Sequence, residues 1–136
     1  MDSSQRRAVE MKLIYERTMG GEGGDETLLG LLELAPGERG MARVNQTVDR
    51  VFEHLTEIDA MIDAHAKDWA VERMARIDLA ILRLAAYELM YVDNIPTGAT
   101  ISEAVELSRV YSTEESGAFI NGVLGNMGRL LEETRR

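Results

Sequence analysis

The chain has 136 residues, of which 45% are hydrophobic and 29% are charged, and its formal net charge is −9 at pH 7. This length and hydrophobic content predict one globular domain and exclude a wholly disordered chain. Cysteine is absent, which excludes disulfide bonds, thiolate chemistry and cysteine-ligated metal.

The charge distribution limits the ligands that the chain can bind. A net charge of −9 argues against non-specific binding of nucleic acid, which depends on neutralising phosphates. Residues 1–19 differ, because they carry four basic and three acidic side chains, a local charge of +1. Any RNA contact is therefore expected to be local. No run approaches the roughly twenty apolar residues of a membrane span, and no apolar signal core follows the amino terminus, so we expect a cytoplasmic protein.

The first part of the chain predicts two helices separated by a glycine-rich break. The first helix is expected over residues 4–19, with Ser3 or Ser4 as its capping residue. Residues 20–24 (Gly-Gly-Glu-Gly-Gly) then interrupt it, and they lack the Gly-Lys-Ser/Thr ending of a phosphate-binding loop. A short helix rich in leucine is expected over residues 27–34, before Pro36.

A third helix is predicted by aliphatic residues that alternate in steps of four and three, the spacing of one helix face. They are Val44, Val48, Val51, Leu55, Ile58 and Ile62. His65 continues this stripe and His54 lies on its flank. The two histidines are eleven residues apart, roughly 16 Å along a helix, so no metal site is expected there.

The central helix is predicted over residues 77–92, after a break near Arg76. Only Asp78, Arg83 and Glu88 are charged in this stretch. A helix that is apolar on nearly every side belongs in the middle of a helical domain. Its charges then need specific partners, and we expect Arg83 to pair with a buried acid.

The last two helices are predicted from two capping-box patterns. Residues 100–103 (Thr-Ile-Ser-Glu) are expected to open a helix that runs to about Tyr111, and residues 112–115 (Ser-Thr-Glu-Glu) to open the last one. The last helix contains several glycines, each of which costs about 0.5 to 1 kcal/mol relative to alanine. We expect close helix packing at Gly122 and Gly125, and tolerance in a fraying tail at Gly128.

These elements predict an all-α protein of about six to seven helices and no strand. Two subdomains, about 1–67 and 68–136, are expected to meet along the third and central helices, and the folded chain is expected to be a monomer or a weak homodimer. Catalysis would need a nucleophile, a base, a metal cage or a cofactor cradle at workable spacing. None is apparent, so we expect no enzyme and no cofactor.

Several fragments between residues 69 and 124 resemble one family when they are taken together and in order. They are Trp69, Asp78-x-x-Ile81-Leu82-Arg83, Tyr87-Glu88-Leu89, Ile95-Pro96, Ile101-Ser102-Glu103-Ala104-Val105-Glu106-Leu107 and Phe119-Ile120-Asn121-Gly122-Val123-Leu124. The stretch resembles the NusB family of bacterial transcription antitermination factors. The resemblance implies an all-helical NusB-like fold of two small bundles.

The resemblance also implies partners and site residues. NusB proteins bind a single-stranded RNA element, boxA, together with NusE, a ribosomal small-subunit protein of the RNA polymerase antitermination complex. The resemblance implies RNA contacts at Arg6 and Arg7 and at the turn before the last helix. It also implies NusE contacts at Tyr15 and Asp78. The residues implied at that turn are Glu115, Ser116 and Phe119. Arg109, one helix away, is the one supplementary basic residue.

Each of these residues also has a structural interpretation. Phe119 lies beside Ile120 in an apolar stripe and suits the core, Tyr15 suits the packing of the first helix, and Asp78 suits an ordinary first helical turn. The chain also departs from the family, since residues 3–5 replace a longer arginine cluster and Ala118 stands where a basic residue is common.

Two other functional hypotheses follow from these departures. The first is a protein-interaction module with the NusB fold that has lost RNA binding. The second is a fragment of an RNA cytosine methyltransferase, a class of enzyme to which NusB-like domains are fused. No methyltransferase sequence follows in this chain, which ranks this hypothesis last.

Overall fold

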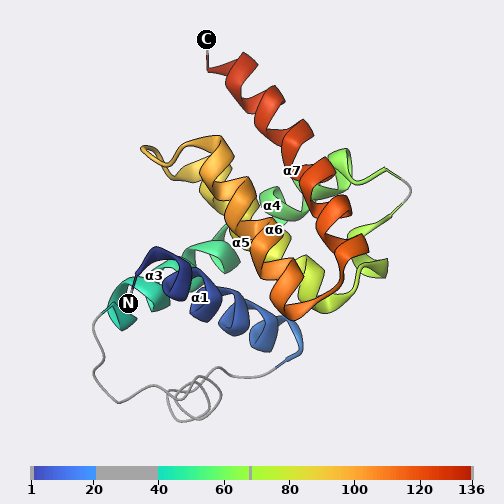
Figure 1. Ribbon diagram of the computed structural model, residues 1–136. Coiled ribbons are helices and arrows are strands. Elements are labelled where there is room, and N and C mark those ends of the chain that lie inside the picture. Colours follow the sequence, from blue (N-terminus) through green and yellow to red (C-terminus); the bar gives the residue numbers. More distant parts are fainter. Residues whose placement is uncertain (1, 21–39, 68, 136) are drawn as a thin grey trace.

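The computed structural model describes residues 2–20, 40–67 and 69–135, and every regular element in these ranges is helical (Figure 1). The elements are α1 (Ser3–Thr18), α3 (Met41–Glu53), α4 (Leu55–His65), the 3-10 helix η1 (Val71–Arg73), α5 (Arg76–Tyr91), α6 (Thr97–Tyr111) and α7 (Glu114–Thr134). The all-α class is therefore confirmed for the described residues. The short helix predicted over residues 27–34 lies outside them.

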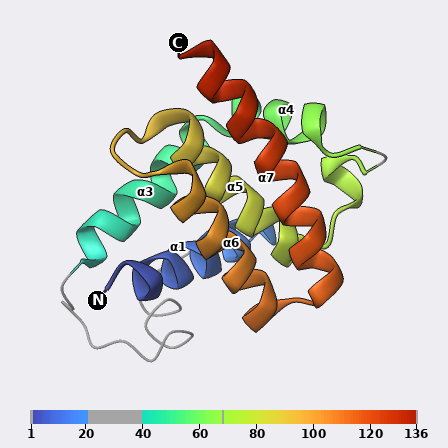
Figure 2. The same ribbon diagram turned by 45° about the horizontal axis from the view of Figure 1, so that its top comes forward.

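Helix α5 lies at the centre, as its composition predicts, and the other helices are arranged around it (Figures 1 and 2). Twelve of its sixteen residues are buried, including all three charged residues between Ile77 and Tyr91. Leu82 is completely buried. Side chains from α1, α3, α4, α6 and α7 join those of α5 in one hydrophobic core. The division into subdomains at residue 67 stays a prediction.

The third predicted helix is in fact two helices, so the expectation of one continuous helix is wrong. The backbone leaves helical geometry at His54, where φ is −107° and ψ is 18°, and the chain resumes as α4. The His54 ring stacks on the Tyr91 ring of α5, with a distance of 4.3 Å between the ring centroids. The aliphatic stripe still faces the core on both sides of the break, because Val51 and Ile58 are completely buried.

The buried charges of α5 find partners on neighbouring helices. Arg83 donates through Nε and Nη2 to the two carboxylate oxygens of Asp59 in α4, at 2.9 and 2.8 Å. Its Nη1 donates to the Thr18 hydroxyl of α1 at 2.8 Å. The predicted pairing of Arg83 with an acid is confirmed, but the acid, Asp59 of α4, is partly exposed rather than buried. The break predicted near Arg76 is also confirmed, since α5 begins at that residue after η1.

The helix caps differ from the predicted ones. Asp2, rather than Ser3 or Ser4, caps α1, and it forms a reciprocal capping box with Gln5. Helix α7 is capped by Thr113, whose hydroxyl accepts from the Ser116 backbone N–H at 3.0 Å. The capping box predicted at residues 112–115 therefore starts one residue too early, because Thr113 and not Ser112 is the capping residue.

The capping box predicted at residues 100–103 is wrong. Helix α6 already begins at Thr97, so Thr100 lies inside the helix. Thr100 is 2% exposed, and its hydroxyl donates to Glu88 Oε1 of α5 at 3.0 Å. Thr100 therefore stabilises a buried carboxylate from within the helix, and its position three residues after the helix start excludes a capping role.

The glycines that permit close packing in α7 are Gly117 and Gly128, not the predicted pair. A Cβ added at Gly128 would lie 2.7 Å from Thr97 Cγ2, and one added at Gly117 would lie 3.1 Å from Ser108 Oγ. Nothing lies within 4 Å of the corresponding position at Gly122. The ends of α7 therefore approach α6 closely, and the expectation of a fraying tail at Gly128 is wrong.

We predict that Leu82→Ala lowers the free energy of unfolding by about 2 to 5 kcal/mol, because it removes buried methyl groups and leaves a cavity in the core. Urea unfolding followed by circular dichroism measures the change. A decrease below about 1 kcal/mol would contradict the central position of α5, because replacing a buried leucine with alanine usually costs more than this.

We predict opposite effects for alanine at two glycines of α7. Gly128→Ala should lower the free energy of unfolding by about 1 to 3 kcal/mol, since the new methyl group collides with Thr97. Gly122→Ala should raise it by about 0.5 to 1 kcal/mol, since the site is exposed and alanine favours the helix. Thermal and urea unfolding of the two variants measure both. A change of the same sign in both would contradict the packing of α6 on α7.

Candidate nucleic-acid interface

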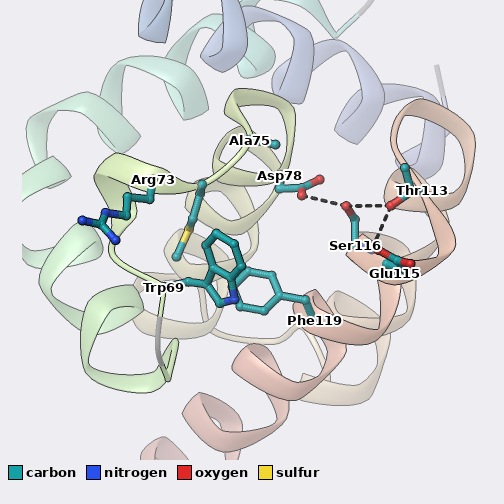
Figure 3. A pocket seen from close by; sticks show the side chains of 9 residues that line it. Trp69, Arg73, Ala75, Asp78, Thr113, Glu115, Ser116 and Phe119 are labelled. Carbon is teal, nitrogen blue, oxygen red and sulfur yellow. Dashed lines mark hydrogen bonds between the residues drawn. The ribbon is translucent and has the colours of Figure 1, made fainter.

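A cavity of about 350 Å³ lies between the segment that leads into α5 and the start of α7 (Figure 3). Its lining residues are Trp69, Arg73, Met74, Ala75, Asp78, Thr113, Glu115, Ser116 and Phe119. We call this cavity the Trp69 pocket. It brings together four of the eight residues expected at binding sites, namely Asp78, Glu115, Ser116 and Phe119.

A hydrogen-bond network joins the two sides of the Trp69 pocket (Figure 3). The Ser112 hydroxyl donates to Asp78 Oδ1 and the Ser116 hydroxyl donates to Asp78 Oδ2, both at 2.7 Å. Asp78 is only 7% exposed, so these bonds compensate for its burial. The carboxylate therefore connects the first turn of α5 to the first turn of α7, and it fixes the shape of the pocket.

Two aromatic side chains from opposite sides line the same pocket (Figure 3). Trp69 is 54% exposed, whereas Phe119 is partly buried against the core. The backbone around Trp69 is anchored, because the Trp69 N–H donates to the Ala66 carbonyl at 3.2 Å. The Val71 N–H likewise donates to Asp63 Oδ1 at 2.8 Å. The sequence does not predict Trp69 as a site residue, because its exposure depends on the conformation of the loop that carries it.

Arg7 is placed inside the protein rather than at its surface. It is 7% exposed, its Nε donates to Glu88 Oε2 and its Nη2 donates to Glu88 Oε1, each at 2.9 Å. The hydrogen bond with Glu88 raises the pKa of Arg7. The expected phosphate contact stays untested, but most of this guanidinium already has a partner.

Arg6 is also paired with a carboxylate. Its Nη1 donates to both carboxylate oxygens of Glu10, at 3.0 and 3.2 Å. Glu10 is completely buried, and burial raises its pKa against the opposing effects of Arg6 and Thr47. The basic start of the chain therefore supplies less free positive charge than its sequence indicates.

Arg109 and Tyr15 lie elsewhere among the described residues. Arg109 is exposed on the last turn of α6, where its Nη2 donates to Glu106 at 2.7 Å. It lines a second cavity between α6 and α7, which does not include Trp69. Tyr15 is 37% exposed on α1. One turn earlier, the Lys12 ammonium lies 4.8 Å from the centre of the Tyr111 ring of α6.

Comparison with known proteins assigns the chain to a family, because residues 4–129 match the NusB family. The chain belongs to the NusB family. Among curated relatives, the transcription antitermination protein NusB of Acetivibrio thermocellus is 42% identical, over 89% of this chain and 84% of that protein. The protein of the same name from Geobacter sulfurreducens is 40% identical, over 93% of this chain and 94% of that protein.

Solved structures agree with the fold. The structure of T. maritima NusB superposes with a TM-score of 0.81 at 28% sequence identity, covering 95% of this chain and 92% of that one. A structure of the antitermination factors NusB and NusE in complex with dsRNA superposes with a TM-score of 0.76 at 22% identity, covering 93% and 95%. The NusB-like helical fold implied by the sequence motifs is therefore confirmed.

Apart from Tyr15, the residues that the sequence predicts for binding lie in two kinds of surroundings. Those at the start of α7 gather with Asp78 around the Trp69 pocket, whereas Arg6, Arg7 and Arg109 each pair with a glutamate. Across residues 2–20, 40–67 and 69–135, no cluster of three histidine or acidic side chains is placed to hold a metal ion. In the same ranges no helix has the length and apolar character of a membrane span.

We predict that Glu10→Gln changes the pH dependence of stability. Burial raises the pKa of Glu10 in the folded protein above the ordinary value of 4.5, which applies to the unfolded chain. At a pH between the folded-state pKa and 4.5, the folded protein binds a proton that the unfolded chain has released. The contribution of Glu10 to the free energy of unfolding therefore increases as the pH falls through the folded-state pKa, and it levels off near 4.5.

The measurement compares urea unfolding of the wild type and of Glu10→Gln from neutral pH down to the ordinary glutamate pKa. The free energy of unfolding of the wild type, minus that of the variant, should rise on acidification. A difference that stays constant over this range would contradict the buried position of the Glu10 carboxylate.

Proposed function

We propose that this chain is a transcription antitermination factor that binds boxA-like single-stranded RNA together with NusE, the ribosomal small-subunit protein. The Trp69 pocket carries this proposal, because it combines the exposed ring of Trp69 and the partly buried ring of Phe119 with hydroxyl and carboxylate groups from the start of α7. The NusB relatives, which align over most of their length, support the same role. This role belongs to the cytoplasm and to the RNA polymerase antitermination complex, and it requires no catalytic step.

The chemistry of the Trp69 pocket suits an unpaired nucleobase. Proteins recognise single-stranded RNA by stacking bases on aromatic rings and by hydrogen bonding to the base edges. Trp69 and Phe119 supply the rings, and the exposed Thr113 hydroxyl and Glu115 carboxylate supply polar groups at the rim. Arg73, exposed at the opposite rim, suits a phosphate next to the base.

A different surface suits NusE. Protein interfaces favour exposed aromatic side chains with a polar rim. Tyr15 on α1 and Tyr111 on α6 are 37% and 38% exposed, and Val110 is 62% exposed. Lys12, which covers the Tyr111 ring, brings α1 and α6 together in this region. We propose that Tyr15 binds NusE here, and that Asp78 contributes mainly by holding the Trp69 pocket in shape.

Binding of RNA is expected to be weak without NusE. The chain has a net charge of −9, and the side chains of Arg6 and Arg109 are shared with Glu10 and Glu106. Each phosphate contact that is lost lowers affinity and its dependence on salt. NusE therefore has to add part of the RNA-binding surface.

The pairing of these arginines is also the observation that favours a second candidate function. A NusB-fold interaction module without RNA binding would keep the Tyr15 surface. It would not require arginines that are available to bind phosphates. The two functions differ in one measurable property, which is a preference of the chain–NusE pair for a boxA-like strand over a scrambled strand.

We predict that Trp69→Ala lowers the affinity of the chain–NusE pair for boxA-like RNA about tenfold or more, because stacking on an aromatic ring contributes about 1 to 3 kcal/mol per base. Fluorescence anisotropy of a labelled strand measures the RNA affinity, and calorimetry measures the affinity for NusE, which should not change. Leu130→Ala is the matched control, since Leu130 is a 43% exposed apolar residue of α7 that does not line the pocket.

The same titrations decide between the two functions. A wild-type pair that binds boxA-like and scrambled strands equally would reject the antitermination role and leave the interaction module. A wild-type preference that Trp69→Ala does not reduce would keep RNA binding but remove the Trp69 pocket as its site.

A further inference from the structure

Helix α3 carries a row of basic and polar side chains beside its buried stripe. Its members are Arg43, Thr47, Arg50 and His54, and we call them the α3 row. Their spacing of four, three and four residues places them on one side of a helix. The buried residues Val44, Val48 and Val51 each lie one position further along the chain, so the α3 row follows one edge of the stripe.

The α3 row lies next to the start of α1. Thr47 lies close enough to Glu10 of α1 to lower the pKa of its carboxyl group, and the Glu10 carboxylate accepts from Arg6 at 3.0 Å. This contact places Arg6 on the same side of the protein as Arg43 and Arg50. One acidic residue of α3, Asp49, pairs with Arg17 near the other end of α1 at 2.6 Å. The other, Glu53, is exposed three residues after Arg50.

Arg43 and Arg50 belong to the arginines that have no carboxylate partner among the described residues, as do Arg73, Arg76, Arg129 and Arg135. Both are exposed, and within residues 2–20, 40–67 and 69–135 neither forms an ion pair with a carboxylate. The ion-paired arginines of these ranges are Arg6, Arg7, Arg17, Arg83 and Arg109. Arg43 and Arg50 therefore add two exposed cations to one side of α3, on a chain whose net charge is −9.

The α3 row ends in a stacked aromatic pair, of which His54 is half-buried and Tyr91 is exposed. The rings of His54 and Tyr91 stack with 4.3 Å between their centroids and an angle of 23° between their planes, and Tyr91 is 40% exposed. Burial and the nearby Glu57 carboxylate raise the pKa of Tyr91. Its hydroxyl, like that of an ordinary tyrosine, is neutral at pH 7 and can donate. Arginines next to an exposed aromatic ring are typical of proteins that bind single-stranded nucleic acid, whose bases stack on the ring. An acidic protein partner could bind the arginines but has no bases to stack on the ring.

We propose that the α3 row binds the sugar–phosphate backbone of RNA that flanks the boxA-like element, with Arg43 and Arg50 on phosphates and Tyr91 beside a base. This inference rests on the proposed function and extends it to a second surface. Asp78 at the Trp69 pocket and Tyr91 lie thirteen residues apart on α5, roughly 20 Å along the helix axis. A strand that fills only the Trp69 pocket therefore does not reach the α3 row.

The test compares two RNA lengths in the presence of NusE. One probe is a short boxA-like strand, and the others are the same strand extended in turn at its 5′ or 3′ end by several nucleotides. The proteins are the wild type, Arg43→Ala/Arg50→Ala, and the matched control Arg43→Lys/Arg50→Lys, which keeps both charges. Circular dichroism verifies that each variant is folded, which is expected because both arginines are exposed.

One extended strand should bind the wild type about tenfold more tightly than the short strand does. The alanine variant should lose this gain, and its salt dependence on the extended strand should decrease by about 1.4 in the log–log slope, since each single-strand phosphate contact contributes about 0.7. The lysine variant should keep most of the gain. All three proteins should bind the short strand equally.

The proposal is overturned if neither extension raises the affinity of the wild type, or if the alanine variant keeps the gain. Equal losses on the short and extended strands would also overturn it, since they would place the arginines within the boxA-like element itself. Failure of the proposed function gives a different result, which is the absence of any preference for the short boxA-like strand over its scrambled counterpart.

Discussion

The structure depends on the burial of a helix, α5, that is apolar on nearly every side and carries three charges into the core. Each charge has partners on different helices. Asp78 accepts from Ser112 and Ser116 at the start of α7, Arg83 binds α4 and α1, and Glu88 binds α1 and α6. Removing one partner of a buried ion pair costs about 3 to 5 kcal/mol. These contacts therefore fix the positions of the surrounding helices, which apolar packing alone specifies less closely.

This use of charge explains why the basic start of the chain contributes less to binding than its sequence indicates. Arg7 is needed by Glu88, which without it would be a buried, unpaired carboxylate. Arg6 has the same relation to Glu10. The arginines with the greatest freedom to bind phosphates are instead those whose neighbours need no compensation, such as Arg43 and Arg50. A basic cluster in a sequence thus overstates the charge that the folded surface presents.

The sequence predicts those parts of the fold that depend on local periodicity and on a single strong pattern. The central α5, its break near Arg76 and the pairing of Arg83 follow from the scarcity of charge in that stretch. The close approaches at Gly117 and Gly128 do not, because they depend on which residues of α6 lie opposite. Of the candidate site, the motif at the start of α7 was predicted. Trp69 was not, because its exposure depends on the geometry of the loop that carries it. The spacing of the α3 row can be read from the sequence, but its position beside Tyr91 depends on a contact between distant segments.

The same contact that completes the fold also builds the candidate site, since Asp78 holds the start of α7 against α5 beside the Trp69 pocket. Such a pocket is formed before any ligand arrives, so binding does not have to include the cost of ordering it. The overall acidity of the chain acts in the opposite direction, because it weakens attraction to any polyanion. A preformed pocket on an acidic protein favours recognition of particular bases over general attraction to phosphate. Selectivity then comes from stacking and hydrogen bonding, and a basic partner has to supply the remaining affinity.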